Sequence, residues 1–517
     1  MQSFLSPRRL KIAAAVACGL GSFTPAATYT WTGTAGDGVW QTGTSVSNWV
    51  DETSAVAYAP GNGGGNSFVF SATGVNTATI TLKNGHNPNI NNMIVNANAA
   101  QTTFVIDGAS HLDFAPTADG GESLTVNGGS NAVINATAPT GTATGGGNVQ
   151  LFSYNENAWR VSSGVFTINA PIVGSGASRG ISKRGGGTLR LTGDSTFGGM
   201  FVAGDGTIEI SSIGNIGETS AAGTGSGITN GQIQISRTTS SSHLNGTLTY
   251  TGADATTNRA ILIAKDTWAN AVTDAAKFTS TVGTLTLTGG ITATAGGDIS
   301  HFTNFTVGGN GNMVVNTNGI FGDLSLIKTG TGRVEINADS LWRGNTTVTA
   351  GTLLINANHT VIGGGTYAVQ NGGTLGGDGA IAGTITVDSG GTLRGGDSLN
   401  VTSVAINGMY DASLLASGSA FGSLVSSGPI TLGETALLSI TADAALALGQ
   451  TFTIIDTPGQ LNGTFAGLAD GALVWAGPNA YEIHYTNGDV TLTTVVPEPA
   501  ALALFSLAGL AALRRRR

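Results

Sequence analysis

Two segments of this chain, 183–210 and 328–355, repeat one pattern of short apolar stretches and glycines with the same internal spacing. Each segment begins with a lysine and ends with an isoleucine. Within each copy, equivalent apolar positions have the same separation, from Leu189 to Ile208 and from Val334 to Leu353. A chain that coils into stacked strands needs such fixed spacing, because each strand pairs with its equivalent in the next coil about 4.8 Å away. The corners need glycine, which tolerates positive φ and close backbone contact.

The repeat therefore predicts an all-β, elongated parallel β-helix, or β-solenoid, with capping segments. Leu189 and Ile208 are expected to point inward, while Arg190 and Glu209 face water. No single coil buries enough apolar surface to be stable, so stability comes from stacking. At about 20 residues per coil, roughly 470 residues of mature chain would form about 23 coils and a rod on the order of 110 Å long.

Composition supports this prediction and argues against disorder. The chain has 81 glycines in 517 residues, more than twice the average glycine content of about 7%. Only 10% of its residues are charged, whereas the average is about 25%. Aliphatic and polar residues nevertheless alternate, as in 284–288 and 233–236, and such alternation indicates half-buried strands. The net charge is −9, and basic residues cluster only at the two ends, so no nucleic-acid surface is expected.

The repeats resemble the autotransporter-associated β-strand repeat, in which a K-x-G-x-G motif precedes alternating strands. Asp194 and Asp339 depart from the usual asparagine, and Gly204 departs from the usual alanine. Further segments resemble parts of large secreted proteins that carry this repeat: 30–49, 371–393, 448–456, 463–465 and 481–485. Residues 211–320 are β-like but degenerate. The resemblance implies a secreted β-helix.

The C-terminal segment 496–517 has the order of a sorting signal. It contains Pro497, Glu498 and Pro499, the apolar run Ala500–Leu513, and then Arg514, Arg515, Arg516 and Arg517. A 14-residue helix spans about 21 Å against about 30 Å of hydrocarbon, so a short transmembrane helix would need thinning of the bilayer. The arginines favour a cytoplasmic end, which places the preceding chain across the inner membrane.

This tail resembles the PEP-CTERM sorting signal of Gram-negative bacteria. The resemblance implies that an exosortase, a membrane-embedded enzyme, acts near Pro497, Glu498 and Pro499. It also implies delivery to the cell surface or extracellular matrix, in association with exopolysaccharide. The alternative is an ordinary tail anchor in which the Pro-Glu-Pro motif occurs by chance.

The N-terminal residues 1–27 are typical of a secretory signal peptide. Basic residues at 7–11 precede an apolar stretch at 12–20, and small residues offer signal peptidase a cleavage site at Ala26 or Ala27. Cys18 lies in a sequence that only faintly resembles a lipobox, and it is the only cysteine. Removal of the peptide would leave a mature chain without disulfides or thiol ligands.

Tryptophans and tyrosines near both ends are expected to cover exposed strand edges, which otherwise promote aggregation. Trp31, Trp40 and Trp49 are evenly spaced and are interpreted as an N-terminal cap. The alternative is a platform on which sugar rings stack. Trp475 and Tyr481 suit a C-terminal cap in the same way.

No catalytic, cofactor or metal site is predicted. The six histidines are widely spaced, and the densest polar cluster, Asp107, His111 and Asp113, is interpreted as surface residues around a turn. Asp378 lies at the wrong position for a calcium-binding nonapeptide, and Gly363–Gly365 lack the Gly-Lys-Ser/Thr of a phosphate loop. A polysaccharide-degrading enzyme would need carboxylate and basic side chains that converge in one groove.

The domain organisation expected from these features has five parts: 1–27, signal peptide; 28–180, N-terminal cap and first coils; 181–400, solenoid with the repeats; 401–495, last coils and cap; 496–517, sorting signal. The function expected is that of a secreted, exosortase-processed surface or matrix protein with a structural or adhesive role, and not an enzyme. A polysaccharide-degrading or carbohydrate-binding β-helix protein is the alternative.

Overall fold

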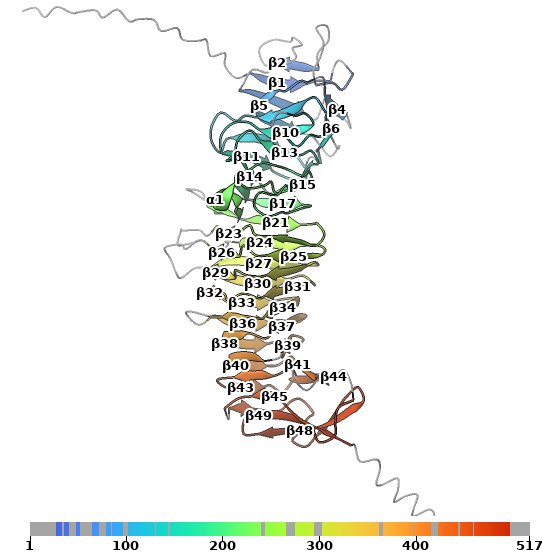
Figure 1. The fold of residues 1–517 in the computed structure, drawn as a ribbon, viewed down its shortest axis with the longest axis vertical. Helices are drawn as coiled ribbons and strands as arrows, with labels where there is room; N and C mark the ends of the chain where they lie inside the picture. Colours follow the sequence, from blue (N-terminus) through green and yellow to red (C-terminus); the bar gives the residue numbers. More distant parts are fainter. Residues whose placement is uncertain are drawn as a thin grey trace, which may run out of the picture.

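The computed structural model describes the chain from 27 to 496 with gaps at 34–35, 41–47, 52–64, 72–78, 84, 97–101, 130, 143–144, 239–242, 265–274, 294–301, 361–364, 397, 415–421, 443–444 and 459. The described residues form an elongated rod of β-strands stacked along its axis (Figure 1). One short helix, α1 (Gly227–Gly231), is present in this part of the chain. The predicted all-β class is therefore confirmed.

Each coil of the rod has three faces, visited in the same order. The first face contains β1 (Thr28–Trp31), β3 (Asn66–Ser71), β5 (Asn89–Asn96), β8 (Glu122–Val126), β11 (Glu156–Val161), β14 (Gly180–Arg184), β16 (Phe201–Ala203), β18 (Ile233–Ile235), β23 (Ile261–Ile263), β26 (Ile291–Ala293), β29 (Ile320–Gly322), β32 (Leu341–Trp342), β35 (Asn358–His359), β42 (Leu424–Ser426) and β45 (Thr451–Asp456).

The second face is the longest uninterrupted ladder. It contains β4 (Thr79–Leu82), β6 (Thr103–Ile106), β9 (Val133–Ala136), β12 (Val165–Ile168), β15 (Thr188–Leu191), β17 (Gly206–Ile210), β21 (Gly246–Tyr250), β24 (Ala275–Ser280), β27 (Thr303–Gly309), β30 (Leu324–Thr329), β33 (Thr346–Val348), β36 (Thr366–Val369), β38 (Ala380–Val387), β40 (Leu399–Ile406), β43 (Ile430–Leu432) and β46 (Leu461–Asn462). Every neighbouring pair is parallel. The long strands β38 and β40 also turn the corner, because their first residues pair with β35 and β42 of the first face.

The third face completes the coil. It contains β7 (His111–Phe114), β10 (Asn148–Leu151), β13 (Ile172–Gly174), β22 (Ala255–Thr257), β25 (Thr284–Leu287), β28 (Asn312–Val315), β31 (Arg333–Ile336), β34 (Gly351–Ile355), β37 (Gly373–Gly376), β39 (Thr392–Arg394), β41 (Met409–Leu414) and β44 (Leu437–Ala442). Parallel strands on all three sides make the fold a parallel β-helix.

The spacing of the repeats reappears as strand register. Leu189 pairs directly with Ile208, and Val334 pairs with Leu353. All four side chains are buried, so alternate residues of successive strands form apolar ladders inside the coil. Glu209 faces outward and bonds Arg190 of the preceding coil. The predicted inward and outward positions are therefore confirmed.

The number of coils is smaller than predicted. The second face has sixteen successive strands in the described residues, where about 23 coils were expected. At about 4.8 Å per step they extend roughly 70 Å rather than 110 Å. The prediction assumed too few residues per coil. Thr103 pairs directly with Val133, and Gly206 pairs with Gly246, so one coil at these places contains more residues than the assumed length. Loops outside the coil account for the extra residues.

The two repeats do not lie on the same side of the rod. The strand that opens the first repeat, β14, lies in the first face, whereas its equivalent, β30, lies in the second face. The chain between them therefore makes whole coils plus one additional face. The degenerate region 211–320 contains this offset and keeps the β-helix continuous.

A buried lysine closes a corner in each repeat. Lys328 Nζ donates to the carbonyl oxygens of Thr329 at 3.0 Å, Gly330 at 2.9 Å and Ala350, in the next coil, at 3.0 Å. Lys183 binds the carbonyls of Gly185, Gly187 and Asp205 in the same way. Burial lowers the pKa of each lysine to about 8. These contacts explain why the motif combines a lysine with glycine turns.

The N-terminal end is closed by an aromatic cluster. Trp31, Trp40 and Trp49 are at most 2% exposed, and the rings of Trp31 and Trp49 meet edge to face with centroids 5.1 Å apart. Trp49 Nε1 donates to the backbone oxygen of Trp40 at 3.0 Å. Strand β2 (Trp49–Asp51) pairs antiparallel with β1. The three tryptophans pack as a cap and offer no open face to a sugar.

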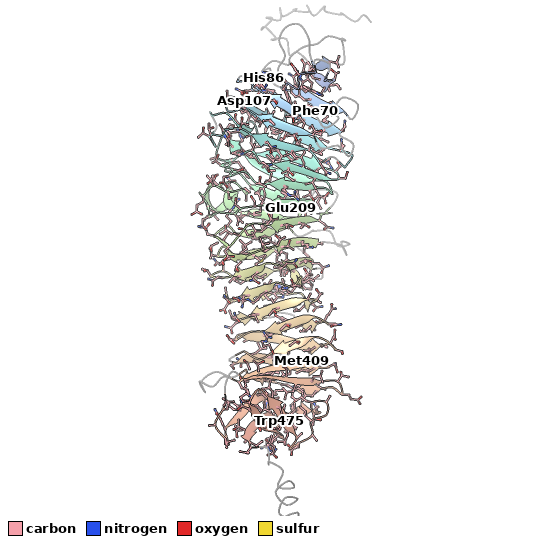
Figure 2. All side chains as sticks on the ribbon, turned by 90° about the vertical axis from the view of Figure 1, so that its right-hand side faces the viewer. Phe70, His86, Asp107, Glu209, Met409 and Trp475 are labelled. Atoms are coloured by element: carbon pink, nitrogen blue, oxygen red, sulfur yellow. The ribbon has the colours of Figure 1, made fainter. Side chains whose placement is uncertain are left out.

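The C-terminal end is closed by antiparallel strands. Strand β47 (Leu473–Ala476) pairs with β48 (Asn479–Thr486), which pairs with β49 (Asp489–Val495). Strand β49 also pairs antiparallel with β45, the last strand of the first face. Tyr481 is buried there, whereas Trp475 is 63% exposed, at the end of the rod opposite Phe70 (Figure 2).

The two predicted processing segments are mostly outside the described residues. Ala26, Pro497, Glu498, Pro499, the run Ala500–Leu513 and Arg514 to Arg517 lie there, so their roles and the short transmembrane helix stay predictions. Among the described residues, no helix is long and apolar enough to cross a membrane. Ala27 accepts a backbone hydrogen bond from Ser67 at 2.9 Å. Val496, directly after β49, is 57% exposed.

Candidate functional site: a polar groove on the first face

A hollow of about 490 Å³ opens on the first face, where strands β11, β14, β16 and β18 lie side by side. Alternation along these strands turns every second side chain outward, so residues far apart in sequence line one surface. The lining is mainly polar: Asp119, Asn155, Glu156, Ser178, Ile181, Met200, Val202, Asn230, Gln234, Arg237 and Thr238. Arg237 belongs to β19 (Arg237–Thr238), which pairs with β20 (His243–Leu244).

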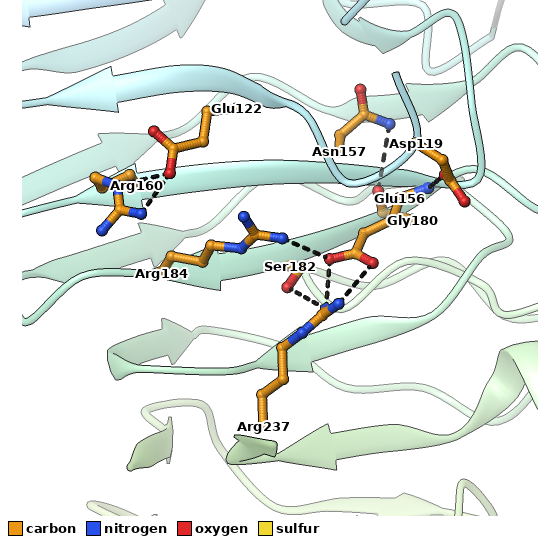
Figure 3. A network of polar contacts seen from close by, with 9 residues as sticks. All are labelled: Asp119, Glu122, Glu156, Asn157, Arg160, Gly180, Ser182, Arg184 and Arg237. Carbon is orange, nitrogen blue, oxygen red and sulfur yellow. Dashed lines mark hydrogen bonds and ion pairs between the residues drawn. The ribbon is translucent and has the colours of Figure 1, made fainter. Parts of the chain in front are cut away.

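Glu156 is the centre of the charge network in this hollow (Figure 3). Its Oε2 accepts from Arg237 Nη2 at 3.1 Å, and its Oε1 accepts from Arg184 Nη2 at 3.3 Å and from Arg237 Nη1. Arg237 Nη1 also donates to Ser182 Oγ at 3.0 Å. Paired guanidinium and carboxylate groups fix each other's orientation through charge-assisted hydrogen bonds. The network therefore fixes how the side chains of Glu156, Arg184 and Arg237 are oriented.

The loop before β8 adds a second carboxylate. Asp119 Oδ1 accepts the backbone N–H of Glu156 at 2.8 Å, and the N–H of Gly120 donates to the Glu156 oxygen at 3.0 Å. Close by, Arg160 is paired with Glu122, and this ion pair raises the pKa of Arg160. Carboxylate and guanidinium groups thus alternate over the surface.

A second hollow of about 470 Å³ adjoins the first. It is lined by Asp119, Phe152, Ser153, Tyr154, Asn155 and Arg179, and it shares Asp119 and Asn155 with the first hollow. We call the two together the polar groove. Phe152 is 47% exposed and Tyr154 is 41% exposed, so two rings form its apolar end.

Glu156, the carboxylate at the centre of the polar groove, is not free to act as the acid or base of glycoside hydrolysis. Carboxylate and basic groups converge here, which was the arrangement expected of a polysaccharide-degrading enzyme. However, both oxygens of Glu156 accept hydrogen bonds from arginines, and one oxygen of Asp119 accepts the Glu156 N–H. A general acid must instead reach the atom that it protonates. The arrangement suits binding better than proton transfer.

The interpretation of Asp107, His111 and Asp113 as surface residues around a turn is wrong for Asp113, which is 4% exposed and lies with His111 on strand β7. His111 Nδ1 pairs with Asp113 Oδ1 on β7, and burial raises the pKa of Asp113. Asp107 lies in the preceding turn, where its Oδ1 accepts the N–H of Ala109 at 3.1 Å. Within the part of the chain that the structure describes, no three His, Cys, Asp or Glu side chains gather as metal ligands would.

Sequence reasoning missed the polar groove. Glu156 and Arg237 lie far apart along the chain, and neither belongs to a motif. The sequence around Phe152 and Tyr154 indicates the site only weakly. These two aromatic residues lie in a polar turn that interrupts the alternation of apolar and polar residues. The predicted aromatic platform of Trp31, Trp40 and Trp49 is instead part of the core.

These contacts define a parallel β-helix that carries a polar groove on one face. Two families match parts of the chain: the passenger-associated-transport-repeat at 181–210 and 326–355, and the PEP-CTERM protein-sorting motif at 495–517. The chain therefore carries two such repeats and one such sorting motif. Both resemblances predicted from the sequence are confirmed.

Two further proteins are similar to this chain. The adhesin BmaC autotransporter of Brucella suis biovar 1 (strain 1330) is 31% identical over 191 residues, which cover 34% of this chain and 5% of that protein. The chain thus matches a small part of the length of that relative. The crystal structure of the Haemophilus influenzae Hap adhesin aligns with 91% of this chain and 71% of its own, at 13% identity and a TM-score of 0.18.

Proposed function

We propose that this protein is exported, processed by an exosortase and displayed at the cell surface or in the extracellular matrix, where it acts as a structural or adhesive rod. The observation that carries the proposal is the combination of two transport repeats with a PEP-CTERM sorting motif on one chain. Similarity to an autotransporter adhesin supports the adhesive role. Signal peptidase is expected to remove residues 1–26 or 1–27 first.

The outer surface of the rod supports a role among hydrated polymers. Polar side chains bond from coil to coil on it: Asn169 Nδ2 donates to Asn135 Oδ1 at 2.7 Å, and Thr192 Oγ1 donates to Asn169 Oδ1 at 2.6 Å. Such a surface exposes many hydroxyl and amide groups in fixed positions. Exopolysaccharide is the partner we propose for it.

The sorting proposal is tested with a triple alanine substitution at Pro497, Glu498 and Pro499. The variant should stay in the inner membrane with its tail attached, while the parent protein reaches the surface with a shortened C-terminus. Cell fractionation and mass spectrometry of the C-terminal peptide measure both outcomes. Alanine substitution of Thr491, Thr493 and Val496, upstream of the motif, is the matched control. Normal surface delivery of the triple variant would refute the proposal.

A further inference from the structure

We propose that the polar groove binds a segment of a neutral polysaccharide built from pyranose rings with mainly equatorial hydroxyls, such as a β-linked glucan. The inference rests on the proposed function, because it names the surface by which the exported rod would hold a glycan. Hollows of about 490 and 470 Å³ are within the size range of small-ligand sites.

The apolar end of the groove is shaped to meet a ring face. Tyr154 is held at φ 55°, a conformation that non-glycine residues rarely adopt, and its hydroxyl donates to the backbone oxygen of Thr117 at 2.9 Å. Backbone strain of this kind persists where the surroundings fix it, often at binding sites. The ring of Tyr154 is thus held in its orientation, and the exposed ring of Phe152 lines the same hollow. A pyranose with equatorial hydroxyls exposes axial C–H groups on its flat faces, and these pack on aromatic rings.

The polar end of the groove has unused donors and acceptors. Asn155 Oδ1 accepts from Arg179 at 3.2 Å, Asn230 Nδ2 donates to Ser226 Oγ at 3.0 Å, and Gln234 Nε2 donates to the Ser236 oxygen at 3.0 Å. Among the described residues, the other polar atom of each of these amides has no protein partner.

These unused groups match sugar hydroxyls. Two are acceptors, the side-chain oxygens of Asn230 and Gln234, and one is a donor, Asn155 Nδ2. A hydroxyl donates one hydrogen bond and accepts others, so a row of hydroxyls satisfies both kinds.

The charges of the groove favour a neutral ligand over an acidic one. Arg184 and Arg237 both bind Glu156, so their charges are already compensated. A polyuronate would need guanidinium groups that are free to form bidentate contacts with carboxylates. The remaining charged residues, Asp119 and Arg179, contribute charges of opposite sign to the second hollow.

The test uses the exported mature protein in affinity electrophoresis through gels with hydroxyethyl cellulose, followed by titration calorimetry with cellohexaose. Phe152→Ser together with Tyr154→Asn removes both rings, and asparagine tolerates the positive φ of position 154. We expect retardation of the parent protein and at least about a tenfold loss of affinity in the double variant. Gln234→Leu should also weaken binding.

The matched control is Phe321→Ser, which removes a ring that is 41% exposed on β29, outside the groove. It should bind like the parent protein, and melting followed by circular dichroism should show that all variants fold. No retardation of the parent protein, equal loss in the control, or preference for oligogalacturonate would overturn the inference. C-terminal processing is read separately by mass, so failure of glycan binding is distinguishable from failure of sorting.

Discussion

His359 shows how this rod tolerates a titratable group inside its coil. Its ring stacks on Trp342 with centroids 3.5 Å apart, and its Nδ1 bonds the hydroxyl of buried Tyr367. Its Nε2 accepts the backbone N–H of Trp342 at 3.4 Å, which requires the neutral ring. Trp342 Nε1 in turn donates to Thr346 Oγ1 at 3.0 Å. Burial lowers the pKa of His359 to about 4.

The stability of the rod should therefore fall in acid. In the unfolded chain His359 binds a proton near pH 6.5, whereas in the folded chain it does so near pH 4, so protons favour unfolding between these values. The contribution of neutral His359 to the free energy of unfolding is fully present above pH 6.5. Up to about 3 kcal/mol of this free energy is lost as the pH falls to 4. Urea denaturation of the parent protein and His359→Gln at pH 7.5, 5.5 and 4.5 measures it.

The comparison between the two proteins isolates this residue. Burial also lowers the pKa of His86, so the parent protein and the variant share that part of the acid sensitivity. The glutamine variant should lose less stability between pH 7.5 and 4.5 than the parent protein. Identical pH profiles would show that His359 does not titrate as its surroundings indicate.

The strands and corners of the repeats were predictable from sequence, because one local pattern encodes them. Leu189 and Ile208, which occupy equivalent positions of the pattern, become direct partners, since apolar alternation and glycine corners act over a single coil. The polar groove was not predictable. Arg237 reaches Glu156 only because intervening coils and loops bring β19 over the first face. Loop lengths between strands follow no sequence rule, and they also caused the error in coil number.

The corners can be tested at a position where glycine is required for two reasons. Gly351, the first residue of β34, has φ 64°, and a Cβ there would lie 2.4 Å from the Gly330 oxygen and 2.6 Å from the Gly332 oxygen. Gly372 also has positive φ, 86°, but its Cβ would meet no atom closer than 4.0 Å. Alanine at either position costs about 1–2 kcal/mol for the backbone conformation.

Gly351→Ala should thus destabilise the rod by at least about 1–3 kcal/mol more than Gly372→Ala, because the neighbouring backbone must shift. Thermal unfolding followed by circular dichroism compares the two variants. Equal melting temperatures would mean that the close approach of coils at Gly351 is not needed. The difference between the variants, rather than either value, measures the crowding of the corner.

At the scale of the whole molecule, the two ends are where the edges of the stacked strands must be covered. A stack of parallel strands leaves a bare edge at its last coil, and bare edges pair with other chains. Strand β49 covers the edge of β45, and its buried Val490 and Leu492 hold it against the core. At the N-terminal end, β2 pairs with β1, and the tryptophan cluster lies beside it, so the first coil is covered in the same way.

Loss of the C-terminal cover should produce association. Val490→Asp with Leu492→Asp places two charges in the core, which should detach β49 and expose β45. Analytical ultracentrifugation should then show dimers or larger species at micromolar concentration. Thr491→Asp, on the outward side of the same strand, should sediment like the parent protein. A monomeric double variant that retains its strand content would show that β49 does not protect the edge.

The uninterrupted ladder of the second face also determines how the rod would respond to tension. Along this ladder each strand pairs with the strand before it and the strand after it, so a pull between the two ends passes through these contacts in series and is not shared among them. The weakest coil then yields first and lengthens, while its neighbours keep their shape. Such a tether would dissipate a sudden load in small steps instead of parting at once.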